Sequence, residues 1–127
     1  ECLSRGASKV TFLENYKDVL IILKKNINNL KQKNNSTIIE KDIFLKNTLK
    51  LLDNKFDIIF MDPPYKEKKL SILIDAIVEL KLLKDNGVII IHRHKKEEDQ
   101  FPRKFNVITK KNYGISKIIF GNTLTKT

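Results

Sequence analysis

The sequence predicts an α/β fold built on a mostly parallel sheet. Short apolar runs alternate with amphipathic stretches, a pattern typical of strand–helix–strand units. The 127 residues, of which 41% are hydrophobic, are enough to form one core. No repeat, low-complexity block or linker rich in Pro, Gly or Ser interrupts this pattern. We therefore expect a single domain over residues 1–127.

The first strand and helix are predicted within residues 9–30. Residues 9–14 (KVTFLE) indicate a short strand that ends in the acid Glu14. From Tyr16 onward, apolar residues recur every three or four positions, which predicts a helix with one buried stripe and with Asn15 as its cap. The members of the stripe are Val19, Leu20, Leu23, Ile27 and Leu30.

The middle of the chain predicts two further strands. The first covers residues 37–40, with Asp42 directly after it and a short helix expected over residues 43–52. The second covers residues 56–61 (FDIIFM) and is nearly all apolar, as in a strand that is covered on both faces. This strand must end at Asp62-Pro63-Pro64-Tyr65, because proline cannot continue a β-ladder.

The last part of the chain predicts a helix and three strands. Leu70, Leu73, Ile74, Ile77 and Leu80 share the spacing of an amphipathic helix. Asp85-Asn86-Gly87 predicts a turn before a buried strand at residues 88–91. Residues 105–109 and 115–120 form a closing strand pair, which can run antiparallel across Asn112-Tyr113-Gly114.

Composition limits the classes of function. The net charge of +10 suits a nucleic-acid partner, although only three of the 25 basic residues are arginine and codon bias in an AT-rich genome explains such a composition equally well. The apolar runs are far shorter than the roughly 20 residues of a membrane-spanning helix, and no secretory signal is visible. Cys2 is the only cysteine, so an internal disulfide is impossible and a cytoplasmic location fits best.

Three acids follow predicted strands: Glu14, Asp42 and Asp62. Ligands of open parallel sheets bind beyond the carboxyl ends of the strands, where these acids are expected to converge. Carboxylates there can accept hydrogen bonds from a ribose diol or from the exocyclic amine of adenine. One such acid is more often a helix cap or a solvated loop residue, but three at successive strand ends favour a ligand site.

Asp62-Pro63-Pro64-Tyr65 has the chemistry that methyl transfer to an aromatic amine needs. The lone pair of such an amine is delocalised into the ring, so the nitrogen is a poor nucleophile. The Asp62 carboxylate and the Pro63 carbonyl can accept its two hydrogens and free the lone pair, while two prolines keep the turn stiff. Tyr65 offers a ring on which a splayed-out base can stack. The alternative is a Pro-Pro turn that only ends a buried strand.

At these residues the chain resembles a Rossmann-like methyltransferase, and more narrowly the RsmD family, which methylates the 2-amino group of a guanine in bacterial small-subunit ribosomal RNA. The resemblance covers almost the whole chain. It rests on Leu3-Ser4-Arg5-Gly6-Ala7, residues 10–14, residues 56–65 and Tyr113-Gly114. Asp-Pro-Pro-Tyr alone is shared with adenine methyltransferases that act on DNA, so the Leu-Ser-Arg-Gly-Ala stretch and the short spacing of the motifs favour the narrower family.

The resemblance implies S-adenosylmethionine as the cofactor. Glu14, with Asn15 beside it, would hold the ribose hydroxyls, and Asp42 would bind the adenine amine beside the Ile43 backbone. Residues 62–65 would engage the target base, with Asp62 also next to the cofactor. The catalytic residues would be Asp62, Pro63, Pro64 and Tyr65.

The expected partner is ribosomal RNA or the small ribosomal subunit. We expect the protein to be a monomer and to have no membrane partner. His92-Arg93-His94-Lys95-Lys96 stands where the family has an acid, and we interpret it as a phosphate-contacting loop or a solvated charge cluster. Two histidines without a Cys or a third His do not predict a metal site. The expected RNA contacts are Tyr65, Lys66, Lys68, Lys69, Arg93, Lys95 and Lys96.

The chain begins with Glu1, and its only methionine is Met61. We therefore expect it to lack an N-terminal part with the first strand and the glycine-rich cofactor loop of the family, and to bind cofactor poorly as it stands. Two alternatives stay open: an adenine methyltransferase that acts on DNA, and an inactive remnant of a methyltransferase.

Overall fold

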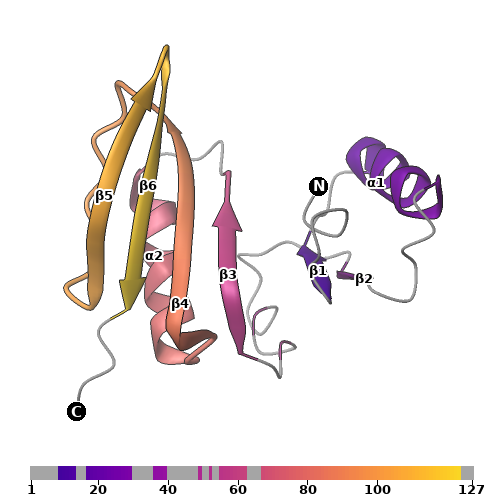
Figure 1. Cartoon of the computed structure of the whole chain (residues 1–127), viewed down its shortest axis with the longest axis horizontal. Coiled ribbons are helices and arrows are strands. Elements are labelled where there is room, and N and C mark those ends of the chain that lie inside the picture. The colour runs from indigo at the N-terminus through magenta and orange to yellow at the C-terminus, as the bar shows by residue number, and fades with distance from the viewer. Residues whose placement is uncertain are drawn as a thin grey trace. The chain divides into compact units, whose positions relative to one another are not determined.

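The computed structural model of the chain describes residues 9–13, 17–29, 36–39, 49, 52, 55–62 and 67–123. Two compact units, Glu1–Thr48 and Leu49–Thr127, are described separately below. Neither helix in the described ranges is long and apolar enough to cross a membrane. The elements are β1 (Val10–Leu13), α1 (Lys17–Asn29), β2 (Ser36–Ile39), β3 (Phe56–Met61), α2 (Glu67–Glu79), β4 (Leu83–His94), β5 (Phe105–Tyr113) and β6 (Ser116–Thr123) (Figure 1).

The first unit contains β1, α1 and β2. The two strands pair in parallel over their whole length, and Leu13 lies opposite Ile39. Leu20 and Ile27 of α1 are buried, as the predicted stripe requires, but the prediction for Val19 is wrong because its side chain is 47% exposed. Val19 precedes Leu20 by one residue and therefore lies on a different side of the helix.

The second unit is built on a four-stranded sheet with the order β3-β4-β6-β5. β3 and β4 run parallel, whereas β6 is antiparallel to both β4 and β5. The antiparallel closing pair expected from the sequence is confirmed, and its turn contains Gly114 at a φ of 57°. This sheet is therefore mixed, with one parallel and two antiparallel pairings among its described strands, and not mostly parallel as the sequence predicted. β1 and β2 form a separate parallel pair in the first unit.

Helix α2 covers one face of this sheet (Figure 1). Leu70 and Ile74 of α2 are fully buried, as are Ile89 and Ile91 of β4. These side chains form the core of the unit, and the helix predicted from the spacing of Leu70, Leu73, Ile74 and Ile77 is confirmed.

The opposite face of the sheet is open in the described part of the second unit. Ile58 and Phe60 of β3 are 59% and 60% exposed. The expectation that β3 is covered on both faces is therefore wrong for this unit, because α2 is the one helix described in it and packs on one side.

A bulge stands where the sequence predicted a turn before β4. Phe56 pairs with Leu83, but Ile58 already pairs with Val88, so the Asp85-Asn86-Gly87 segment is an irregularity inside the strand. A Cβ on Gly87 would lie 2.6 Å from Leu83 Cδ1 and 2.9 Å from the Asp57 carbonyl oxygen. The glycine at this bulge permits the close approach of the β3 backbone.

Candidate active site

Asp62 lies at the carboxyl end of β3, directly after Met61. The Met61 side chain is buried against the core, and the next residue along an extended chain points the other way. The Asp62 side chain is 64% exposed on the open side of the sheet. The local sequence thus places a carboxylate at the edge where ligands of parallel sheets bind.

His92 of β4 contacts this carboxylate. Met61 pairs with Ile91 in the parallel register, so the following residues, Asp62 and His92, lie side by side on the same face. The distance from His92 Nδ1 to Asp62 Oδ1 is 2.9 Å. An ionised carboxylate only accepts hydrogen bonds, so the Nδ1–H of His92 is the donor. The contact engages Oδ1, and the Asp62 side chain remains 64% exposed.

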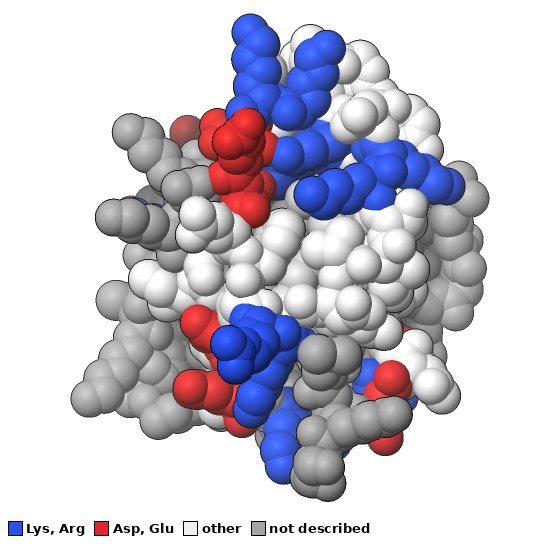
Figure 2. Space-filling view, turned by 90° about the vertical axis from the view of Figure 1, so that its left-hand side faces the viewer, with Lys and Arg blue, Asp and Glu red and all other residues white. Residues whose placement is uncertain are grey.

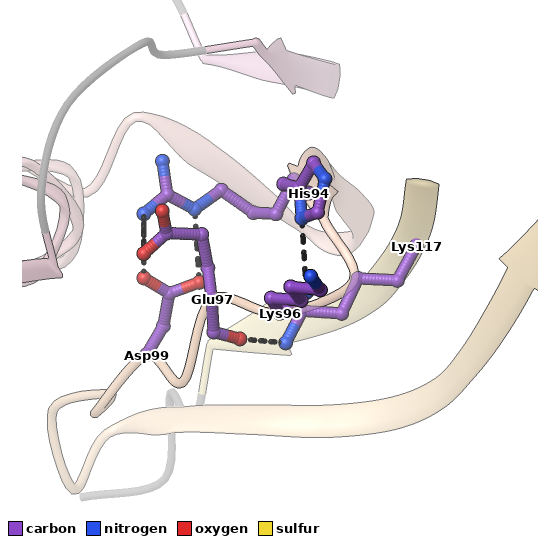
Figure 3. Close-up of polar contacts among 6 residues, drawn as sticks. His94, Lys96, Glu97, Asp99 and Lys117 are labelled. Atoms are coloured by element: carbon purple, nitrogen blue, oxygen red, sulfur yellow. Dashed lines mark hydrogen bonds and ion pairs between the residues drawn. The ribbon is translucent and has the colours of Figure 1, made fainter. Parts of the chain in front are cut away.

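Arg93 points to the opposite side of β4 and is buried. Its Nε and Nη2 each donate a hydrogen bond of 2.9 Å to one oxygen of Asp99, and Glu97 Oε2 lies 3.7 Å from Nη2 (Figure 3). The exposed fractions of the Arg93 and Asp99 side chains are 3% and 1%. This bidentate pair anchors the segment after β4, so the phosphate contact expected of Arg93 is corrected to a structural role.

Further hydrogen bonds hold the segment after β4. His94 Nδ1 accepts the backbone N–H of Lys96, and Lys117 donates its amine to the carbonyl oxygen of Glu97 (Figure 3). Lys95 donates its backbone N–H to the Ile115 carbonyl oxygen over 2.8 Å. The backbone is thus held in place while the side chains of Lys95 and Lys96 stay exposed.

Two other predicted RNA contacts, Lys68 and Lys69, lie on α2. Lys69 is exposed on α2, and the side chain of Lys68 lies outside the described residues. The remaining predicted residues also lie outside the described ranges: Glu14, Asn15, Asp42, Ile43, Pro63, Pro64, Tyr65 and Lys66.

The ends of β1 and β2 precede two of the predicted cofactor contacts in the sequence. β1 and β2 are parallel, so the segments that begin after Leu13 and Ile39, and that carry Glu14 and Asp42, start at the same edge of their sheet. Carboxylates at such an edge fit ribose hydroxyls and an adenine amine. The described residues contain no group of three His, Cys, Asp or Glu side chains that could hold a metal ion.

His92 is the site residue that sequence reasoning missed. The sequence placed it in a basic loop, but β4 continues to His94 and carries His92 within the ladder. His92 directly follows the apolar run of β4, just as Asp62 directly follows that of β3. This correspondence becomes meaningful only when the register of β3 and β4 is known.

Comparisons with known proteins show which proteins this chain resembles. A family model described as conserved hypothetical protein 95 matches residues 1–122. Ribosomal RNA small subunit methyltransferase D of Buchnera aphidicola is 34% identical over 87% of this chain, and that of Haemophilus influenzae is 34% identical over 91%. A solved structure of a proposed methylase from Haemophilus influenzae matches with a TM-score of 0.78 and 32% identity, over 96% of this chain and 76% of that one.

The chain belongs to the conserved hypothetical protein 95 family and is an RsmD-like sequence. It spans 57% and 60% of the length of the two curated relatives. The resemblance stated from the sequence motifs is thereby confirmed, and the α/β fold agrees with the solved methylase structure.

Proposed function

We propose that this member of the family carries the catalytic residues of an S-adenosylmethionine-dependent methyltransferase that modifies the 2-amino group of a guanine in small-subunit ribosomal RNA. The names of the curated relatives support ribosomal RNA as the substrate class. The observation that carries the proposal is the exposed Asp62 carboxylate at the carboxyl end of β3, followed in sequence by Pro63-Pro64-Tyr65.

Asp62 would act on the target amine. Its free carboxylate oxygen accepts one amine hydrogen, and the Pro63 carbonyl oxygen accepts the other, which turns the nitrogen lone pair toward the methyl group. The amine nitrogen would take up the methyl group that the bound cofactor supplies and would then lose one proton, which Asp62 or water would accept. No covalent enzyme intermediate is needed, and Tyr65 would stack on the base.

The cofactor contacts proposed for Glu14 and Asp42 follow the chemistry of their side chains. Glu14, with Asn15, would accept hydrogen bonds from the two ribose hydroxyls, and Asp42 with the Ile43 backbone would bind the adenine amine. When bound, the cofactor supplies an electrophilic methyl group on a sulfonium.

Ribosomal RNA would contact lysines at the end of the sheet that carries Asp62. Lys95 and Lys96 follow β4 there, and Lys117 of β6 is held beside them. Figure 2, which looks onto the side at the left of Figure 1, shows Lys and Arg side chains gathered at the top beside Asp and Glu, with an uncharged band below them. Three further lysines follow Asp62 in the sequence: Lys66 directly precedes α2, and Lys68 and Lys69 lie in its first turn. Exposed lysines release counterions from RNA phosphates when they bind.

Methylation of small-subunit RNA and of assembled small subunits tests this function. The product of the complete reading frame that contains these residues is incubated with radiolabelled S-adenosylmethionine, and the modified nucleoside is identified by mass spectrometry. We expect 2-methylguanosine. Methylated adenine in DNA would support the alternative adenine methyltransferase, and no product on any substrate would support an inactive remnant.

Asp62→Ala should lower the methylation rate about 100-fold or more, because a preorganised acceptor is lost, while the affinity for S-adenosylmethionine stays within a few-fold. Asp57→Ala is the matched control, since Asp57 lies at the other end of β3, has an 80% exposed side chain and pairs with Lys84. Normal methylation by Asp62→Ala would refute the role of Asp62.

A further inference from the structure

We infer that His92 is a positioning residue that holds the Asp62 carboxylate in the orientation required for methyl transfer. The inference rests on the proposed function and deepens it. It starts from the 2.9 Å contact between His92 Nδ1 and Asp62 Oδ1, which joins the ends of two parallel strands on the open face of the sheet.

The contact constrains which oxygen of Asp62 meets the substrate. A carboxylate on a 64% exposed side chain can rotate freely between several orientations unless a partner holds it. The Nδ1–H of His92 engages Oδ1, so Oδ2 remains as the acceptor for an amine hydrogen. His92 therefore selects one rotamer of Asp62 before the substrate binds, which removes that ordering cost from the reaction.

The backbone of β4 fixes His92 firmly enough for this role. His92 pairs with Ile118 of β6 on one side of β4, and the preceding residue, Ile91, pairs with Met61 of β3 on the other. Three strands thus set the position of the imidazole, and its side chain is 36% exposed. A donor carried by a central strand is more rigid than one carried by a loop.

The energetics favour a role in catalysis over a role in stability. Exposed polar pairs contribute little to folding, because water competes for both partners and ordering the side chains costs entropy. The His92–Asp62 pair is partly exposed on both sides, unlike the buried Arg93–Asp99 pair on the next residue. Loss of the imidazole should therefore appear in the reaction rate much more than in the melting temperature.

The proposed role of His92 does not change the chemical step of methyl transfer. The amine lone pair forms the bond to the methyl carbon, the electron pair of the breaking bond passes to sulfur, and one proton leaves the nitrogen to Asp62 or to water. His92 gains and loses no proton in this sequence; it donates one hydrogen bond throughout.

The test compares three substitutions at His92 in the product of the complete reading frame. The side-chain nitrogen of Asn can take the place of Nδ1, whereas that of Gln takes the place of Nε2. We expect His92→Ala and His92→Gln to lower kcat about 10- to 100-fold with little change in KM for S-adenosylmethionine, and His92→Asn to recover most of the rate. Melting temperatures of the variants establish that each is folded.

His94→Ala is the matched control, because His94 lies on the same strand and its Nδ1 accepts the Lys96 backbone N–H instead of contacting Asp62. The double variant Asp62→Ala/His92→Ala should be no slower than Asp62→Ala, since His92 acts through Asp62. A folded His92→Ala variant with a wild-type kcat, or equal recovery by Asn and Gln, would overturn the inference alone. A wild-type protein that methylates no ribosomal RNA would overturn the proposed function and the inference together.

Discussion

The two faces of the four-stranded sheet differ in what covers them and in the polar pairs that they carry. On the face covered by α2, Ile89, Ile91 and Ile119 are at most 1% exposed, and Arg93 forms a buried pair with Asp99. On the open face, Ile58 and Phe60 are more than half exposed, and His92 forms a partly exposed pair with Asp62.

Because of this difference, alternate side chains of β4 contribute either to the stability of the core or to the candidate site. Ile91 and Arg93 alternate with Ile90 and His92 on β4, so the strand serves the core with one set of side chains and the candidate site with the other. A buried ion pair needs both partners, because a single buried charge is costly. An exposed carboxylate can instead meet a substrate without a large desolvation cost.

The largest effect on stability is expected from Arg93→Ala. It leaves the Asp99 carboxylate, 1% exposed, without its bidentate partner, which should lower the free energy of unfolding by about 3–5 kcal/mol. Urea denaturation measures the change. Adding Asp99→Ala to the variant should restore part of the loss, and Lys95→Ala, at an exposed neighbour, should have little effect. A loss below about 1 kcal/mol would mean that the pair does not hold the segment after β4.

A second pair of substitutions compares the faces directly. Ile91→Ala should cost about 3 kcal/mol, because it removes fully buried methyl groups and leaves a cavity against α2. Ile90→Ala, at the half-buried position next to it, should cost about 1 kcal/mol. The same denaturation experiment checks both, and equal losses would show that the open face is covered in the folded protein.

A smaller effect is expected from Gly121→Ala on β6. The added Cβ would overlap Phe105 Cζ and lie 2.8 Å from the Asn106 carbonyl oxygen, so Phe105 must move from its buried position. We expect a loss of about 2 kcal/mol. Gly114→Ala has no atom within 4 Å of the new Cβ and suffers only from a φ of 57°, so about 1 kcal/mol is expected. A reversed order in thermal melts would contradict this packing.

The smallest effect on the fold, but a clear effect on binding, is expected from Lys95→Ala/Lys96→Ala. Both side chains are exposed at the end of the sheet that carries Asp62. The salt dependence of ribosomal RNA affinity should weaken by about one unit of slope per lysine, with stability unchanged within about 0.5 kcal/mol. Lys55→Ala/Lys84→Ala removes the same charge at the opposite end of β3 and β4. Equal slopes in filter-binding assays for the two double variants would place the RNA elsewhere.

The elements of the fold were predictable because local patterns decide them. β3 was predicted with its observed bounds since FDIIFM is a continuous apolar run stopped by prolines. α2 followed from its spacing. The bulge in β4 was missed because Asp-Asn-Gly predicts a turn locally, whereas pairing with β3 keeps it inside the strand. Val19 was misplaced because its spacing fits the stripe less well than that of Leu20 and Ile27.

By itself, the sequence determined the order of the strands and helices that the structure describes, the family, and the position of Asp62 after its strand. The helix predicted over residues 43–52 lies almost wholly outside the described residues. Only the tertiary structure decided that His92 meets Asp62 and that Arg93 is buried with Asp99. Sequence reasoning grouped these two neighbours in one basic loop, although they point to opposite faces of β4. The physical reason is that side chains alternate along a strand, so the partner of each depends on the register of the adjacent strands, which a linear pattern does not contain.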